Sequence, residues 1–217
     1  MVGPTNPVRP QDRAQDLFDD FRQRAEVMFR QQRRIYEYLA RYLSVSNEQS
    51  EQVLEVGCGA GVGTAVIERA LVENNSGTII GTDLVYPKLA AELYLWIKFS
   101  TWDVMTGPWV DLFPPDHVVA VEVIEHVADP ALAIKNMLAT LRPGGTLWLS
   151  TPNGVGKPRP PENPYHVCEY TPAEVIEFIG DASFEANIRV LDWETFEPVN
   201  ADTTECNPLV YRVVKGG

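Results

Sequence analysis

The pattern of apolar and polar positions predicts a helical start to the chain. Between residues 11 and 43, apolar side chains return at steps of three and four residues, which is the spacing of one face of an α-helix. The segment before it, residues 1–10, contains three prolines and is expected to form a loose tail. We therefore expect a tail and helical lid over residues 1–45, followed by the main domain over residues 46–217.

Beyond this segment, short β-prone runs alternate with helical runs. Strands are expected at 53–56, 78–82, 97–101, 118–123, 146–150, 188–193 and 209–214. Helices are expected at 61–73, 87–95, 130–141 and 171–178. Thr171 suits the N-cap of the last helix and Pro172 its first position. Because single strands are separated by helices, the pattern predicts an α/β fold with a parallel sheet and helices on both of its faces.

The most informative run joins the first expected strand to the first expected helix. It reads Val-Leu-Glu-Val-Gly-Cys-Gly-Ala-Gly-Val-Gly-Thr over residues 53–64, with an acid at Glu55 and glycines at Gly57, Gly59 and Gly61. Such a run lets a strand turn sharply into a helix whose first backbone N–H groups are left for a ligand. The run therefore predicts a ligand-binding turn.

The glycine spacing does not fit a dinucleotide-binding loop. That fingerprint requires Gly-x-Gly-x-x-Gly. Counted from the first, second or third glycine of the run, its last glycine position is occupied by Val62, Thr64 or Val66. The spacing therefore disfavours a pyrophosphate-binding turn and NAD as the ligand.

Two acidic residues come at the ends of later strands. Asp83 follows the second expected strand, about twenty residues past the glycines, and Asp103 follows the third. Ligands of open α/β sheets bind beyond the carboxyl ends of the strands, so we expect Asp83 to accept ribose hydroxyls and Asp103 to accept an adenine amino group. Leu84 and Val104, the next residues along the chain, belong to the same expected contacts. For either aspartate, a turn or helix cap is the alternative.

The run Glu-x-Gly-x-Gly-x-Gly resembles the first motif of class I S-adenosylmethionine-dependent methyltransferases. Leu-Arg-Pro-Gly-Gly-Thr-Leu at 141–147 is similar to the signature that precedes the fifth strand of that family. The resemblance covers residues 53–178. It implies a Rossmann-like fold with a mostly parallel seven-stranded sheet, S-adenosylmethionine as cofactor, and Glu55 as the acid that orients the loop and the cofactor's amino group.

A second set of chemically active residues follows the fourth expected strand. Glu122, Glu125 and His126 lie within five residues, and His166 from a later loop can join them. Two carboxylates and a histidine at one point repel or desolvate each other unless a cation joins them. The four residues predict a site for Mn²⁺, or for Mg²⁺ with waters, with zinc as a further option. Glu122 is also expected to touch the cofactor. The alternative is a pocket without metal, in which a histidine acts as general base.

This set resembles two branches of the methyltransferase superfamily. The small-RNA 3′-terminal 2′-O-methyltransferases carry Glu-x-x-Glu-His, Thr-Pro-Asn and His-x-x-Glu-aromatic-Thr, and the ubiquinone-type O-methyltransferases share Glu-x-x-Glu-His and use a divalent ion. The matching positions here are Glu122 to His126, Thr151-Pro152-Asn153 and His166 to Thr171. The chain differs from the RNA branch because it is acidic and has no evident RNA-binding extension.

Composition narrows the partners and the compartment. A net charge of −12 repels a phosphate backbone, so a long nucleic-acid footprint is not expected. The cysteines Cys58, Cys168 and Cys206 contain no Cys-x-x-Cys pair, which favours reduced thiols and a cytoplasmic location. The start of the chain lacks the pattern of a signal peptide, and no apolar run approaches membrane-spanning length. Association with a membrane is therefore not expected, and a homodimer is one option for the oligomeric state.

These patterns together predict a metal-assisted O-methyltransferase that acts on a hydroxyl of a small molecule or sugar. A metal would bind the hydroxyl and lower its pKa, with Glu125, His126 and His166 as the catalytic set; without metal, His126 or His166 would be the base. The expected lid includes the loop at 153–164, where Lys157 and Arg159 are the basic residues. An RNA 2′-O-methyltransferase and a non-catalytic cofactor-binding module are the two alternatives.

Overall fold

The structure is a computed structural model of the chain. It describes residues 32–45, 50–159, 161, 163–182, 185–200, 203 and 206–216. The chain forms two compact units, residues 1–34 and 35–217, and only the last three residues of the first unit are described. Within the described ranges, no helix combines the length and the apolar character needed to cross a bilayer.

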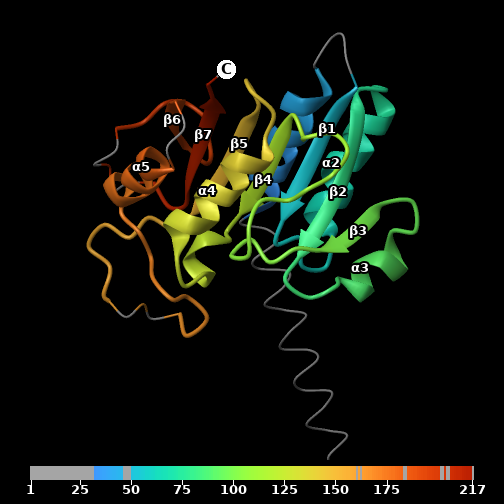
Figure 1. Ribbon diagram of the computed structural model, residues 1–217. Coiled ribbons are helices and arrows are strands. Elements are labelled where there is room, and N and C mark those ends of the chain that lie inside the picture. The colour runs from blue at the N-terminus through green and yellow to red at the C-terminus, as the bar shows by residue number, and fades with distance from the viewer. Residues whose placement is uncertain are drawn as a thin grey trace, which may run out of the picture. The chain divides into compact units, whose positions relative to one another are not determined.

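The second unit is built around one seven-stranded sheet (Figure 1). Its strands are β1 (Glu51–Val56), β2 (Gly77–Asp83), β3 (Lys98–Thr101), β4 (His117–Val121), β5 (Thr146–Thr151), β6 (Ala186–Asp192) and β7 (Leu209–Lys215). Their order across the sheet is β3-β2-β1-β4-β5-β7-β6, and β7 runs antiparallel to both of its neighbours. The predicted α/β fold with a mostly parallel seven-stranded sheet is confirmed.

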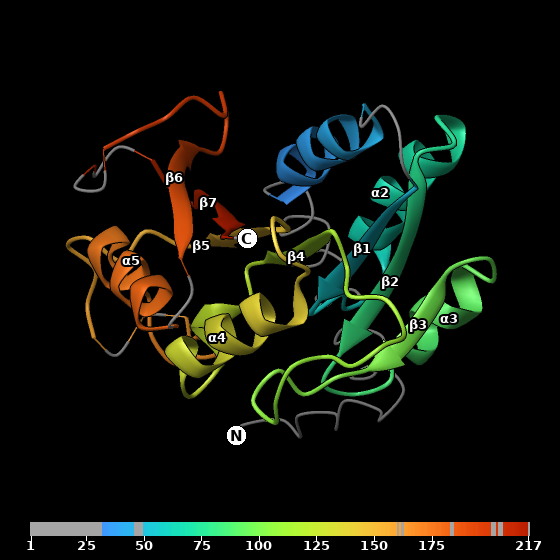
Figure 2. The ribbon, with the colours of Figure 1, turned by 45° about the horizontal axis from the view of Figure 1, so that its top comes forward.

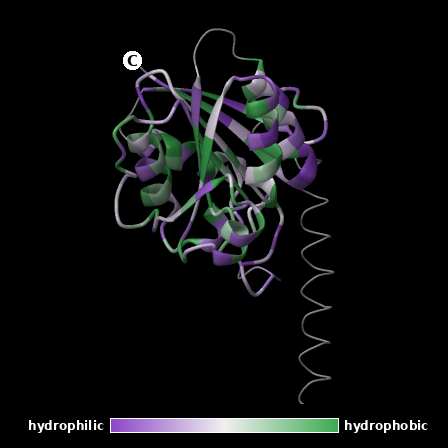
Figure 3. Ribbon diagram, turned by 90° about the vertical axis from the view of Figure 1, so that its right-hand side faces the viewer, coloured by the Kyte–Doolittle hydropathy of each residue, from purple (hydrophilic) through white to green (hydrophobic). Residues whose placement is uncertain are grey.

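Helices cover both faces of this sheet, as Figure 2 shows. They are helical residues 35–44, α2 (Val62–Glu73), α3 (Lys88–Leu93), η1 (Ile124–His126), α4 (Pro130–Thr140) and α5 (Pro172–Asp181). The helices α4 and α5 pack on one face, and α2 and helical residues 35–43 pack on the other. Figure 3 shows hydrophobic residues along the central strands and hydrophilic residues on the outer sides of the helices.

Strand β4 shows how the apolar residues divide between the two faces. Val118 and Ala120 belong to the core under α4 and α5, whereas Val119 and Val121 belong to the core under α2. Successive side chains of a strand point to opposite faces, so a strand covered on both sides must be apolar throughout. This requirement explains why the sequence of β4 is an unbroken apolar run after its first residue.

The starts of two helices are set by local capping residues. The Asp129 side chain accepts a hydrogen bond from the backbone N–H of Leu132 at 2.9 Å, and Pro130 begins α4. At α5, Thr171 and Glu174 form a reciprocal capping box ahead of the core-facing side of the helix. The predicted roles of Thr171 and Pro172 are confirmed.

Several boundaries differ from those expected, and two of them bear on the site and the expected lid. Strand β4 ends at Val121 instead of continuing to residue 123, because Glu122 turns away with a left-handed backbone (φ 55°). The second compact unit begins at Ile35, inside the segment expected to form the helical lid. Ile35 and Leu39 are buried in the core of that unit. The remainder of the expected helix, residues 11–31, lies outside the described residues, and a closing motion there stays a prediction.

Truncation of a core side chain in α4 should destabilise the fold strongly. Met137 is fully buried between α4 and the sheet. Met137→Ala should lower the free energy of unfolding by about 2–5 kcal/mol, because it removes buried methylenes and leaves a cavity. Lys135→Ala, at an exposed position of the same helix, should change it by less than about 0.5 kcal/mol. Urea unfolding followed by circular dichroism measures the free energy of unfolding of both variants. Equal unfolding midpoints for the two variants would contradict the assigned core.

Candidate functional site

A cavity opens beyond the carboxyl ends of the central strands. Its volume is about 560 Å³, within the range of small-molecule sites. The order of the strands reverses between β1 and β4, and ligands of α/β sheets bind at such a point. The lining residues are Val56, Gly57, Asp83, Leu84, Trp102, Asp103, Val104, Met105, Glu122, Val123, His126, Val127 and Ala128.

Most of the expected cofactor residues lie on the wall of this cavity, and the others do not line it. Gly57, both aspartates with their following residues, and Glu122 line the cavity, whereas Glu55, Gly59 and Gly61 do not. Trp102 and Met105 also line the cavity and were not among the expected contact residues. Both are neighbours in sequence of expected contact residues, which is the only signal that would have pointed to them.

The turn between β1 and α2 requires glycine at two positions. Gly57 has φ 72° and Gly61, the N-cap of α2, has φ 74°, a conformation that residues with a Cβ rarely adopt. A Cβ atom at Gly57 would lie 2.8 Å from Val123, and one at Gly61 would lie 2.7 Å from the Cβ of Ala90. The glycines therefore allow both the backbone conformation and the close packing of the turn.

Asp83 joins the end of β2 to this turn. One carboxylate oxygen accepts a hydrogen bond from the N–H of Gly59 at 2.8 Å, and the other accepts from the N–H of Leu84 at 2.7 Å. Each oxygen keeps a further lone pair for a ligand hydroxyl. Asp103 accepts from the N–H of Met105 at 2.9 Å, the local turn contact that was the alternative for this residue. Both aspartates nevertheless line the cavity.

Glu55 is fully buried behind the turn. Its carboxylate accepts hydrogen bonds from the hydroxyl of Tyr36 at 2.7 Å and from the hydroxyl of Thr64. Burial raises its pKa to about 7, against the opposing effect of these two donors. Glu55 therefore supports the loop through protein contacts and does not face the cavity.

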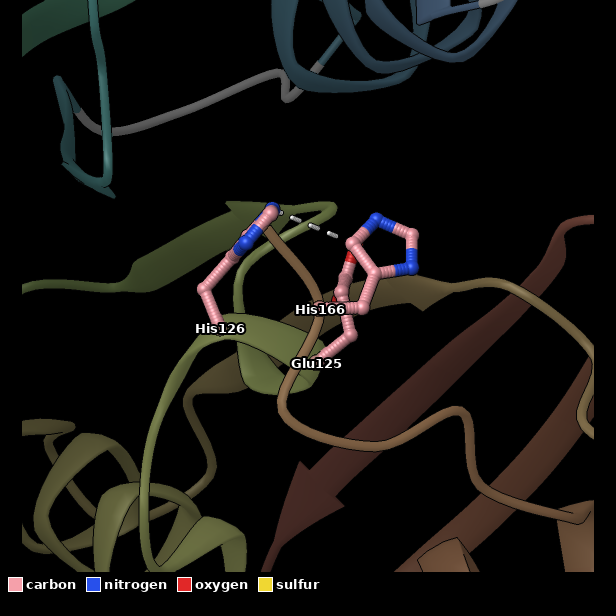
Figure 4. A group of neighbouring side chains, drawn as sticks. All are labelled: Glu125, His126 and His166. Carbon is pink, nitrogen blue, oxygen red and sulfur yellow. Dashed lines mark ion pairs between the residues drawn. The ribbon is translucent and has the colours of Figure 1, made fainter. Parts of the chain in front are cut away.

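Three of the four expected metal ligands come together. Glu125, His126 and His166 each place a ligand atom within 4.8 Å of the others (Figure 4). Oε1 of Glu125 lies 3.9 Å from Nε2 of His126. Glu125 is fully buried, its Oε2 accepts from Thr151 at 3.1 Å, and its Oε1 has no hydrogen-bond partner among the described residues.

Both imidazoles are held through their Nδ1 atoms. His126 Nδ1 lies 2.8 Å from the carbonyl oxygen of Tyr165, and His166 Nδ1 lies 2.9 Å from the carboxylate of Glu169. A carbonyl or carboxylate accepts, so each Nδ1 carries the proton and each Nε2 has a lone pair. The amide of Asn163 donates to His166 Nε2 at 2.9 Å. The two Nδ1 contacts are typical of histidines that bind metals through Nε2, whereas the Asn163 amide occupies that lone pair of His166.

Glu122 does not join this three-residue group. Its left-handed backbone brings its carboxylate to β5, where the hydroxyl of Ser150 donates to Oε1 at 2.8 Å. Burial raises the pKa of Glu122 to about 7. Burial also raises the pKa of Glu125 well above its usual range, and the charge of Glu122 adds to this effect. Glu122 lies on the wall of the cavity, and the expected four-residue cluster is a three-residue cluster in the structure.

The expected lid loop is tied down at its described start. The N–H of Gly154 donates to the carbonyl of Tyr170, and Arg159 pairs with Glu174 at the start of α5. The N–H of Val167 donates to the carbonyl of Glu125 at 2.7 Å, which holds the loop beside η1. Arg159 is therefore engaged within the protein.

Comparison with known proteins agrees with this fold and identifies the family. The profile of the family described as "Methyltransferase domain" matches residues 27–201. A probable S-adenosylmethionine-dependent methyltransferase of Mycolicibacterium smegmatis is 32% identical over 165 residues, which cover 72% of this chain and 59% of the relative. The chain thus spans less than two thirds of that relative. A ubiquinone biosynthesis O-methyltransferase of Coxiella burnetii is 32% identical over 113 residues, 48% of this chain and 45% of the relative.

Solved structures show the same fold. The N-methyltransferase NodS of Bradyrhizobium japonicum, in complex with S-adenosyl-L-homocysteine, aligns with a TM-score of 0.61 at 20% identity and covers 86% of this chain and 88% of its own. The family match over residues 27–201 includes the glycine turn, the cavity and the three-residue cluster. The chain therefore belongs to the methyltransferase domain family, a family of transferase enzymes.

Proposed function

We propose that the chain is an S-adenosylmethionine-dependent O-methyltransferase, assisted by a divalent metal, that acts on a hydroxyl of a small molecule or sugar. The observation that carries this proposal is the position of His126. It lines the cofactor cavity and is also a member of the three-residue cluster. A hydroxyl held at the cluster is thereby close to a methyl group in the cavity, as in-line transfer requires.

The cavity wall supports S-adenosylmethionine as the cofactor. The glycine turn leaves the first N–H groups of α2 for the methionyl part, and Asp83 keeps lone pairs for the ribose hydroxyls. Asp103 lies at the next strand end for the adenine. The wall includes three carboxylates and neither lysine nor arginine among the residues that line it. A cationic sulfonium is better suited to such a wall than a pyrophosphate.

The three-residue cluster fits a divalent ion. Its donors are one carboxylate oxygen and two imidazole nitrogens, a set that suits Mn²⁺ or zinc, and Mg²⁺ when waters complete the shell. The buried Oε1 of Glu125, without a partner in the described part of the chain, is a group that a cation would satisfy. A bound metal supplies Lewis acidity that lowers the pKa of a hydroxyl.

The protein's own residues orient this chemistry. Tyr165 and Glu169 hold the two imidazole rings through their Nδ1 atoms, and Thr151 holds one oxygen of Glu125. A metal bound by Nε2 of His166 would replace the amide of Asn163 there. If no metal binds, the lone pair of His126 Nε2 is the candidate base for the hydroxyl proton. The non-catalytic alternative is disfavoured because a binding module has no use for a buried carboxylate oxygen that has no hydrogen-bond partner among the described residues and lies beside two oriented histidines.

A second candidate is methyl transfer to the 3′-terminal 2′-hydroxyl of RNA. The observation in its favour is the contact between His166 and Glu169, which belong to the motif shared with that branch. The charge of the chain and the pairing of Arg159 with Glu174 favour a small neutral acceptor. Transfer of labelled methyl groups to single-stranded RNA, compared with phenolic and sugar acceptors, separates the two candidates.

The first prediction concerns cofactor binding. The chain should bind S-adenosyl-L-homocysteine and not NAD, and Asp83→Ala should weaken that binding by about 1–3 kcal/mol because ribose hydroxyls lose their acceptor. Asp111→Ala removes an exposed carboxylate outside the cofactor cavity and is the matched control. Isothermal titration calorimetry measures the affinity of the wild type and of both variants for S-adenosyl-L-homocysteine. Unchanged affinity in Asp83→Ala would contradict the ribose assignment.

The second prediction concerns the metal. Wild-type protein should bind Mn²⁺, and Glu125→Gln should weaken binding on the order of 100-fold because a charged ligand becomes neutral without a change of shape. His117→Gln, at the opposite end of β4, should bind Mn²⁺ as the wild type does. Calorimetry with MnCl₂ and metal analysis after dialysis provide the readouts, and chelation should abolish turnover of any accepted hydroxyl. Full turnover in protein shown to be metal-free would leave His126 or His166 as the base.

A further inference from the structure

A tyrosine outside the glycine motif reaches the carboxylate behind it. Tyr36 lies on helical residues 32–44 and is 5% exposed. Its hydroxyl donates to one oxygen of Glu55 at 2.7 Å, and the hydroxyl of Thr64 donates to the other oxygen. The carboxylate of Glu55 makes no hydrogen bond to solvent, because its side chain is fully buried. Both donors are therefore needed to keep this carboxylate satisfied.

These contacts close the cofactor turn from behind. Glu55 lies just before the turn, at the end of β1, and Thr64 lies just after it, in the first turn of α2. The carboxylate thus bridges the two ends of the segment that contains Gly57 and Gly61. The hydroxyl of Thr82 donates to the carbonyl of Glu55 at 2.7 Å, which fixes the backbone at the same point.

The ring of Tyr36 also packs against the start of α2. A Cβ atom added to Gly63 would lie 2.1 Å from the Cζ atom of Tyr36. No side chain fits between them, so the ring lies directly on the backbone of the first helical turn. Tyr36 therefore contacts the turn segment in two ways, through its ring at Gly63 and through its hydroxyl at Glu55.

We propose that Tyr36 is a positioning residue for cofactor binding: through Glu55, its hydroxyl holds the start of α2 and the preceding glycine turn in the conformation that receives S-adenosylmethionine. The proposal rests on the proposed function for the identity of the ligand. It makes cofactor affinity dependent on helical residues 35–44, which pack on the face of the sheet behind the turn. By linkage, the cofactor stabilises the docking of that helix to the same extent.

The charge of Glu55 provides a readout that packing alone would not change. Burial raises its pKa to about 7, the donors Thr64 and Tyr36 oppose this, and the charge of Asp83 adds to it. Cys58 on the turn is the other titratable group beside it, and Glu122 acts on Tyr36 from the end of β4. Loss of the Tyr36 donor should raise the pKa of Glu55 further, so the carboxylate becomes neutral at a higher pH.

The direction of the pH effect follows from the charge of the ligand. S-adenosylmethionine carries a net positive charge and is attracted by an ionised Glu55, whereas S-adenosyl-L-homocysteine is neutral overall. Affinity for the cation should fall as the pH drops through the pKa of Glu55. In a variant without the Tyr36 hydroxyl, that fall should begin at higher pH, and the neutral ligand should show little pH dependence.

The test compares Tyr36→Phe with Tyr38→Phe. Tyr38 lies on the same helix, but its ring stacks on Phe196 at 3.7 Å, away from Glu55. Calorimetry at pH 8 should show that Tyr36→Phe binds S-adenosyl-L-homocysteine about 5- to 20-fold more weakly than the wild type, since a buried acceptor loses its donor. Tyr38→Phe should bind within about twofold of the wild type. Amide hydrogen exchange of residues 57–64 should be faster in ligand-free Tyr36→Phe.

Three outcomes separate the possibilities. A lower melting temperature of Tyr36→Phe with unchanged affinity, exchange and pH profile would overturn the proposal, because the hydroxyl would then stabilise the fold alone. If Tyr36→Phe does not fold, Thr64→Val and Thr64→Ser test the same contact from its other donor. Only the serine keeps a hydroxyl that can donate to Glu55. Equal cofactor affinities of these two variants would also overturn the proposal. Failure of the wild type to bind either ligand would instead contradict the proposed function.

Discussion

The site depends on the parallel pairing of β1 with β4. Val53 to Val56 lie in register with His117 to Ala120, so the two strands end at the same edge of the sheet. The chain leaves β1 toward α2 on one face and leaves β4 toward α4 on the other. The two connections therefore diverge at this edge and leave a cavity between them. The glycine turn follows the end of β1 and the Glu125–His126 pair comes soon after the end of β4, which places the cavity beside the three-residue cluster.

Three glutamates around this edge, two buried and one half-buried, have different surroundings and so suit different roles. Glu55 accepts from two hydroxyls and closes the turn from behind. Glu122 accepts from Ser150 and lines the cavity from a left-handed backbone position, the kind of strain that concentrates at functional sites. Glu125 keeps one buried oxygen without a partner in the described structure, beside two oriented imidazoles. The hydrogen-bond contacts thus distinguish a carboxylate that supports the turn from a carboxylate that is available to a ligand.

Much of the fold followed from local patterns in the sequence. The alternation of short strands and helices predicted the sheet and its two covered faces, because strands of a doubly covered sheet must be apolar on both sides. Helix starts were recognisable from capping residues such as Thr171, since a cap acts on its own neighbours. The spacing of the glycines and the aspartates after later strands identified the cavity edge, because parallel strands bring their carboxyl ends together.

Tertiary structure decided which of these residues face a ligand. The sequence by itself determined the fold class, the glycine turn and the edge at which the polar residues gather. It did not determine that Glu122 turns to Ser150 and leaves the other three expected ligands together, because this follows from one backbone angle and a contact with β5. Nor did it determine that Tyr36 reaches Glu55, because a hydrogen bond across 19 residues exists only after the helix has packed on the sheet.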